Sequence, residues 1–116
     1  AAEKALQAAR DAKLKADSLK APKAVPKLYS EGEELLAQGQ TAESKQEFTQ
    51  AKDLYTQAKG TFEQAAEKAE ELRKKALKAI QEAEQAISDV EKNAEEAEKE
   101  AALPAEETQQ EGENNE

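Results

Sequence analysis

Small and apolar residues recur every three or four positions between Phe48 and Ala101, and this spacing restricts the fold more than any other feature. The steps alternate regularly, with one stutter between Ala76 and Ile80. Residues at this period lie along one side of an α-helix and form the seam of a coiled coil. The sequence therefore predicts one long helix over residues 41–102.

Gly60 lies inside this seam and offers an alternative. Glycine commonly ends a helix, and Thr61 and Gln64 have the spacing of a capping box that would begin a new one. The apolar positions keep their phase across the glycine, whereas an inserted turn would usually shift them. The spacing favours a continuous helix, and a break at Gly60–Thr61 is the competing interpretation.

Two further helices are expected before the long one. Residues 2–20 carry an alanine-rich stripe at helical spacing, and Pro22 ends it because the residue before a proline avoids helical geometry. A second helix is expected over residues 26–38. Pro26 suits its first turn, and Gly39 suits a left-handed C-cap.

The predicted fold class is all-α, with a single domain over residues 1–102, and two arrangements are open. If the prolines only kink the chain, the first helix continues the second and the molecule is an elongated helical hairpin. If the prolines reverse the chain, the first helix completes a small three-helix bundle around residues 48–58. In both arrangements a tight reversal at Gly39 would set Gly32 near Phe48.

The end of the chain has a different composition. Beyond Leu103 and Pro104 apolar residues are almost absent, so a disordered acidic tail is expected over residues 103–116. The net charge is −9, and residues 81–116 carry two basic and thirteen acidic side chains. This excess of negative charge repels phosphates, so nucleic acid is not expected as a partner.

The composition also opposes catalysis. The chain has no His, Cys, Met or Trp, so the usual general base, thiolate nucleophile and imidazole or thiolate metal ligands are missing. Glutamates such as Glu67 and Glu71 have helical spacing, but carboxylate metal sites in helical bundles also use histidine. We expect no enzyme activity, no cofactor, no metal site and no small-molecule substrate.

Large apolar residues late in the seam have no expected partner within the chain. An isolated helix gains little from helix propensity alone, and alanine buries little apolar area. Exposed aliphatic side chains here therefore predict a protein partner or self-association, and the alternative is that they are ordinary core. We define the candidate partner seam as five residues of the long helix: Leu72, Ile80, Ala83, Ile87 and Val90.

Residues 24–58 resemble a single tetratricopeptide-type hairpin. The register is carried by six positions with the expected alternation of large, small and aromatic side chains: Leu28, Gly32, Leu35, Ser44, Phe48 and Ala51. Thr56 stands where the closing proline of that repeat belongs, and the next 34 residues do not repeat the pattern. The resemblance therefore does not extend to a repeat array.

A larger part of the chain, residues 2–100, looks like a family of uncharacterised helical modules in bacterial envelope lipoproteins, including spirochaete ones. The resemblance is carried by the alanine-rich first helix, Pro26, L-L-A-Q-G-Q-T-A at 35–42 and A-K-D-L-Y-T-Q-A-K at 51–59. It implies an interaction role in the bacterial cell envelope, in the periplasm or on the outer surface, and no activity. The lipid-bearing cysteine of that family is absent from this sequence, so membrane attachment is expected only through an anchor outside it.

The function expected from the sequence is a non-catalytic interaction or spacer module that binds a protein partner or itself. The alternative is reversible binding to lipid surfaces by amphipathic helices. Helices of that kind carry large apolar and aromatic residues with basic flanks. The stripe in this chain is mostly alanine.

Overall fold

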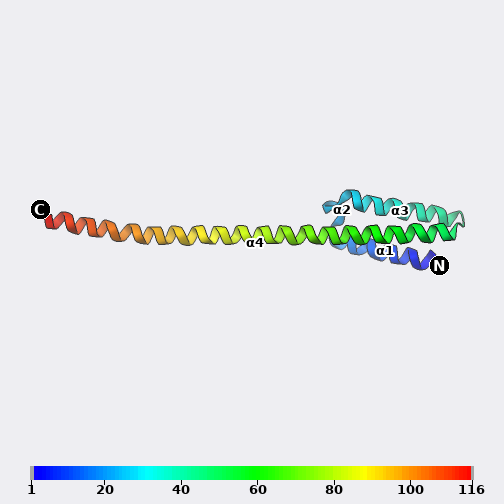
Figure 1. Cartoon of the computed structure of the whole chain (residues 1–116), viewed down its shortest axis with the longest axis horizontal. Coiled ribbons are helices and arrows are strands. Elements are labelled where there is room, and N and C mark those ends of the chain that lie inside the picture. The colour runs from blue at the N-terminus through cyan, green and yellow to red at the C-terminus, as the bar shows by residue number, and fades with distance from the viewer. Residues whose placement is uncertain (1, 116) are drawn as a thin grey trace. The chain divides into compact units, whose positions relative to one another are not determined.

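The computed structural model describes the backbone of residues 2–115 and the side chains of residues 2–101. The described residues form four helices, which follow one another in the order α1 (Ala2–Ser18), α2 (Ala21–Ala24), α3 (Pro26–Ser44) and α4 (Phe48–Asn115) (Figure 1). The predicted all-α class and the long C-terminal helix are confirmed. By its contacts the chain forms two compact units, Ala1–Lys75 and Ala76–Glu116.

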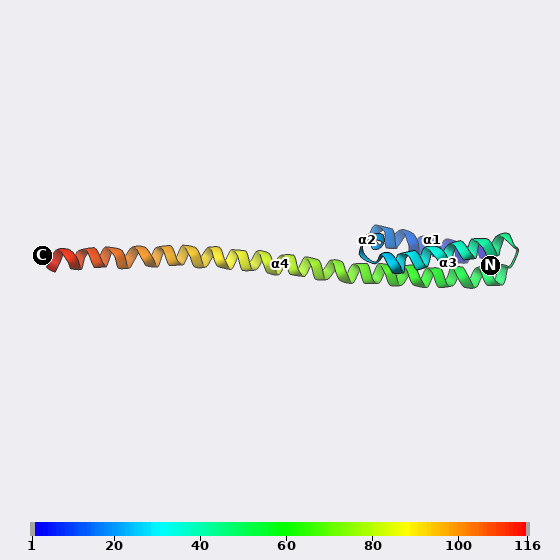
Figure 2. The same ribbon diagram turned by 90° about the horizontal axis from the view of Figure 1, so that it is seen from above.

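The first unit is a three-helix bundle. Figures 1 and 2 show α1 and α3 both lying alongside the first part of α4. The two prolines therefore reverse the chain, as in the second of the two predicted arrangements. Pro22 lies in the first turn of α2 and Pro26 in the first turn of α3, where proline is tolerated because no hydrogen bond is lost.

The turn between α3 and α4 corrects the prediction that Gly39 ends the second helix at residue 38 and that the long helix begins at residue 41. The helix α3 continues to Ser44, and the residue with the left-handed backbone is Gln46, with a φ of 64°. The amide of Gln46 donates to the carbonyl of Glu43, and that of Glu47 to the carbonyl of Ala42, both at 2.9 Å. This is the Schellman pattern of a helix C-terminus.

Gly39 has a packing role in place of a capping role. A Cβ atom at Gly39 would lie 2.5 Å from the ring of Tyr55, and one at Gly32 would lie 2.7 Å from the ring of Phe62. Each glycine therefore lets α3 approach α4 closely enough for an aromatic ring to lie against its backbone.

Gly32 thus lies against Phe62 and not against Phe48, which corrects the predicted pairing of α3 with α4. The difference is two heptads, so the same side of α4 faces α3 in both pairings. Phe48 begins α4 just after the turn and is 55% exposed.

The core of the bundle combines alanines with three aromatic rings. Tyr55 and Phe62 are its largest fully buried side chains, and Tyr29 packs edge-on against Phe62 with ring centroids 5.4 Å apart. Among the described side chains no charged group is buried. The alanines that complete this core come from α1, α3, α4 and the single turn α2: Ala2, Ala9, Ala12, Ala16, Ala21, Ala42, Ala51, Ala58, Ala65, Ala66 and Ala69.

The two reversals of the bundle share a local design. Lys20 and Gln46, which follow α1 and α3, both have a left-handed backbone, with φ values of 60° and 64°. The hydroxyls of Ser18 and Ser44 donate to carbonyls three residues back, at 2.7 and 2.8 Å. The sequence repeats accordingly, because A-D-S at 16–18 and L-Y at 28–29 recur as A-E-S and L-Y 26 residues later.

A buried tyrosine closes each reversal. The hydroxyl of Tyr29 donates to the carboxylate of Asp17, and that of Tyr55 donates to the carboxylate of Glu43 at 2.6 Å. Burial, then the carboxylate acceptor, raises the pKa of Tyr29 above its ordinary value and that of Tyr55 to about 12. Both hydroxyls therefore stay protonated and act as donors at neutral pH.

Gly60 lies within α4, and the predicted continuity of the helix at this position is confirmed. A Cβ atom at Gly60 would meet no other atom within 4 Å. This glycine therefore has neither the capping role that the alternative required nor the packing role of Gly32 and Gly39.

The helix α4 extends to Asn115, beyond the predicted end at residue 102. The predicted acidic tail over residues 103–116 begins inside this helix, and its side chains lie outside the described residues. The disorder of this tail and the domain boundary after residue 102 stay predictions.

Candidate functional site

The candidate partner seam is exposed along α4. Leu72, in the first unit, is 40% exposed. In the second unit Ile80 is 53%, Ile87 59% and Val90 66% exposed, and Ala83 is exposed as well. The alternative that these residues form ordinary core within the chain is therefore wrong.

Leu77 belongs with these residues, although it was not included in the candidate seam. Its side chain is 45% exposed, and it follows Ala76 directly at the stutter of the apolar pattern. Leu77 was not included because it lies one position after Ala76, which is the residue at the regular spacing. The signal that could have found it is a leucine among the lysines of a helix that has no nearby core.

The seam of the second unit has two different flanks. In heptad terms Ile80 and Ile87 occupy one column, and Ala76, Ala83 and Val90 occupy the other. The flank beside the first column carries Ala79, Ala86 and Asn93, and the opposite flank carries Glu84, Glu91 and Glu98. One side of the seam is therefore narrow and neutral, so that another helix can approach closely, and the other side is acidic.

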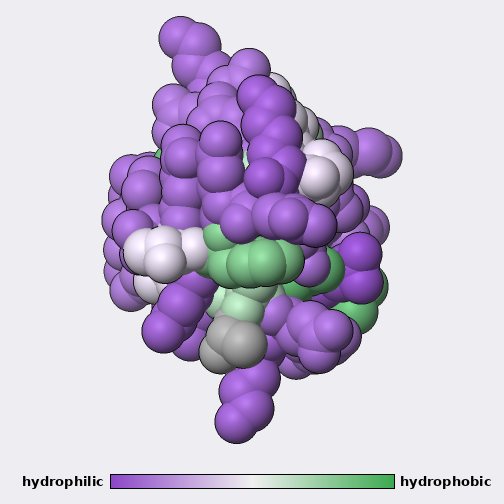
Figure 3. Space-filling view, turned by 90° about the vertical axis from the view of Figure 1, so that its right-hand side faces the viewer, coloured by the Kyte–Doolittle hydropathy of each residue, from purple (hydrophilic) through white to green (hydrophobic). Residues whose placement is uncertain are grey.

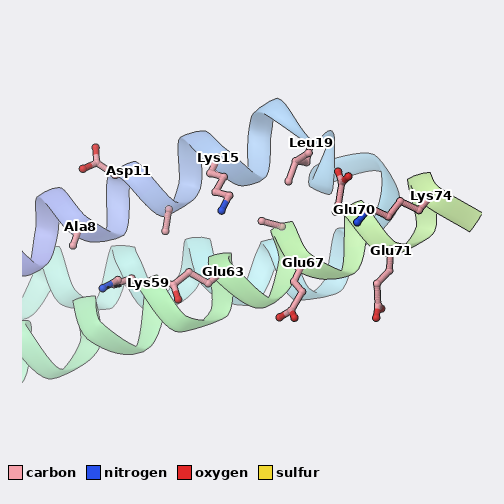
Figure 4. Close-up of a pocket in the computed structure, with 12 residues that line it drawn as sticks. Ala8, Asp11, Lys15, Leu19, Lys59, Glu63, Glu67, Glu70, Glu71 and Lys74 are labelled. Atoms are coloured by element: carbon pink, nitrogen blue, oxygen red, sulfur yellow. Dashed lines mark ion pairs between the residues drawn. The ribbon is translucent and has the colours of Figure 1, made fainter.

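Two grooves of the first unit are lined by α4 residues between Lys59 and Lys74. The groove between α1 and α4, of about 960 Å³, has charges of both signs (Figure 4). The Lys15 side chain points from α1 toward α4, whereas the carboxylates of Glu67 and Glu71 point away from α1. Lys59 and Glu63 form an exposed ion pair across one helical turn at 3.8 Å. Such a pair contributes little to stability.

The second groove, of about 840 Å³, lies where the end of α1, α2 and α4 meet. Its apolar wall consists of Leu19, Ala24, Ala69 and Leu72. Its charged wall residues are Lys20, Lys23 and Arg73, all of them basic. We call this the basic groove, and sequence reasoning missed it because its residues come from α1, the turn after α1, α2 and α4.

The end of the bundle that carries the chain's N-terminus is mainly hydrophilic, with a small hydrophobic area at its centre (Figure 3). Phe48 is the large apolar residue at the start of α4 and is half-exposed.

Among residues 2–101 no group of three or more His, Cys, Asp or Glu side chains is arranged to hold a metal ion. Within the same part of the chain, no helix combines the length and the apolar character needed to cross a bilayer.

Comparisons with protein-family models, with curated proteins and with solved structures found no match for this chain.

Proposed function

We propose that this chain is a non-catalytic interaction module of a bacterial envelope protein, and that it associates with a second copy of itself through the candidate partner seam. The observation that carries the proposal is the exposure of large aliphatic side chains at heptad spacing on α4. Ile80, Ile87 and Val90 are each more than half exposed in a unit that consists of one helix.

A helix of this kind gains stability when its seam is covered. Helical peptides are marginal in water when they have no tertiary packing, because propensity alone contributes little. Covering the seam removes apolar surface from water at about 25 cal/mol per Å². The exposed isoleucines and valine contribute most to this gain, and the alanines between them allow a close approach.

Charge favours a second copy in the antiparallel orientation. Residues 68–78 carry five basic and two acidic side chains, whereas residues 82–100 carry two basic and eight acidic ones. Parallel pairing would bring the acidic stretch of one copy against the same stretch of the other. Antiparallel pairing brings each acidic stretch toward the basic stretch of the other copy, which is the electrostatically complementary arrangement.

The sizes of the seam residues fit the same orientation. In an antiparallel pair of helices, residues of one heptad column face residues of the other column. If Ile80 faces Ala83 of the second copy, Ile87 faces Ala76 of that copy. Each of the two isoleucines then meets an alanine, and alternation of this kind fills space without strain.

The proposed envelope location is supported by the resemblance of residues 2–100 to helical modules of bacterial envelope lipoproteins. The absence of His and Cys from the sequence supports the non-catalytic part of the proposal. The interaction itself is supported by the exposed seam.

The seam can be tested with charged substitutions. The Ile80→Asp/Ile87→Asp variant should be monomeric at concentrations at which the unmodified chain self-associates, because unpaired carboxylates would be buried at a cost of several kcal/mol. The matched control is Gln81→Asp/Ser88→Asp, which has the same spacing on a side of the helix that faces away from the seam. Sedimentation velocity gives the fraction associated. Self-association of the isoleucine variant at the level of the unmodified chain would exclude the seam.

A further inference from the structure

We infer that the basic groove of the first unit binds the acidic helical segment 91–101 of a second copy. This inference rests on the proposed self-association and adds a second contact area to it. The groove supplies basic side chains around an apolar wall, and the segment supplies acidic side chains around a stripe of alanines.

The basic groove is built on a firmly held backbone. Lys20 has a left-handed conformation, and its amide donates to the carbonyl of Asp17 at 3.0 Å. The next residue, Ala21, is fully buried, and its carbonyl accepts a hydrogen bond of 2.8 Å from Val25. Lys20 and Lys23 are exposed at the edge of the groove. Their ammonium groups therefore remain available to a ligand.

Arg73 provides the third positive charge from α4. It also approaches Glu70 at 3.6 Å, but the arginine side chain is 62% exposed, so the pair is weak and open to exchange. The groove therefore presents three basic groups around Leu19 and Leu72. A ligand for such a site is acidic, with a narrow apolar side.

Segment 91–101 has both properties. It carries five acidic and two basic side chains, for a net charge of −3 against the +3 of the groove residues. Ala94, Ala97 and Ala101 form one stripe at heptad spacing and are exposed in the structure. Alanine keeps the backbone of a docked helix close to the wall, so that its glutamates reach the lysines at the edge.

The neighbouring groove between α1 and α4 does not match the same ligand. Among its lining residues five are acidic and three are basic. An acidic helix would be repelled there, which makes the basic groove the favoured position.

Charge reversal on the full chain tests the inference. Lys20→Glu/Lys23→Glu should weaken self-association about 10-fold or more, and so should Glu95→Lys/Glu98→Lys. An equimolar mixture of the two variants should associate as strongly as the unmodified chain, because each groove then meets a segment of opposite charge. The control Lys4→Glu/Lys52→Glu makes the same change of net charge at exposed positions outside the groove.

Light scattering on each variant and on the mixture gives the result. The inference is supported if each of the two variants associates more weakly when it is measured by itself and if association recovers in their mixture. An equal effect of the control variant, or a mixture no stronger than its components, would overturn it. If Ile80→Asp/Ile87→Asp still abolishes association in that case, the proposed function stands without the groove. An unmodified chain that stays monomeric would overturn both.

Discussion

Tyr55 donates a hydrogen bond of 2.6 Å to Glu43 across the turn between α3 and α4. The ring of Tyr55 is fully buried, and the carboxylate of Glu43 accepts the hydrogen bond of its hydroxyl at the edge of the core. Tyr29 makes the equivalent bond to Asp17 at the other reversal. Each pair spans twelve residues and fixes the direction in which the next helix leaves the turn.

Removal of one of these hydroxyls should destabilise the bundle. Tyr55→Phe keeps the ring in place but leaves Glu43 without its donor, and a hydrogen bond to a charged group contributes about 1.5–3 kcal/mol. We expect a loss in the free energy of unfolding near the lower end of this range, measured by urea denaturation. Tyr29→Phe removes the equivalent bond at the other reversal and should cost a similar amount. A neutral result for both variants would show that these bonds contribute nothing.

Stability should fall at high pH because of the same tyrosines. In the folded chain the pKa of Tyr55 is raised to about 12, whereas the unfolded side chain has an ordinary pKa of 10.0. A raised pKa means that this contribution is fully present below pH 10 and is lost as the pH rises to about 12. The urea midpoint of the unmodified chain should therefore decrease in this window more steeply than that of Tyr55→Phe. Parallel curves for the two proteins would contradict this account.

The glycines should respond to alanine in opposite directions. Gly39→Ala pushes a methyl group into the ring of Tyr55, and overpacking of this kind costs about 1–3 kcal/mol. Gly60→Ala should stabilise the chain by up to about 1 kcal/mol, because alanine is the better helix former and the position is open. Thermal unfolding followed by circular dichroism distinguishes the two. Destabilisation by both substitutions would mean that α4 does not pass through Gly60 as a regular helix.

Glycine at position 46 should stabilise the turn between α3 and α4. Gln46 has a left-handed backbone that costs a non-glycine residue about 1 kcal/mol. Gln46→Gly should therefore raise the free energy of unfolding by about 0.5–1 kcal/mol, whereas Gln40→Gly inside α3 should lower it by a similar amount. Chemical denaturation of the pair measures both effects. A loss of stability in the Gln46 variant would contradict the observed turn.

The heptad seam predicted much of this fold because its period is a direct consequence of helix geometry. The all-α class and the passage of α4 through Gly60 followed from it, whereas the start of a helix at Pro26 followed from the tolerance of proline in a first turn. The position of the turn between α3 and α4 was predicted wrongly, because Gly39, which resembled a helix cap, is required for packing against Tyr55. The left-handed position was filled by a glutamine, which gives no turn signal.

The error in the turn displaced the pairing of α3 with α4 by two whole heptads, so the buried side of α4 was still correct. The repeat of A-D-S and L-Y after 26 residues was the signal that could have corrected it. The exposure of Ile80, Ile87 and Val90 agrees with a seam that lacks a partner in the chain. The basic groove could not be predicted, because Lys20, Lys23 and Arg73 meet only when the end of α1 and the turn α2 lie beside α4.

The central claim is that two copies of the chain associate, and the mass of the unmodified protein in solution tests it most directly. Multi-angle light scattering over a concentration series should show the mass rising from 12.6 kDa toward twice that value. The transition should move to higher concentration as salt is added, because the complementary charges of residues 68–78 and 82–100 are then screened. A mass that stays at 12.6 kDa at every concentration would contradict the account.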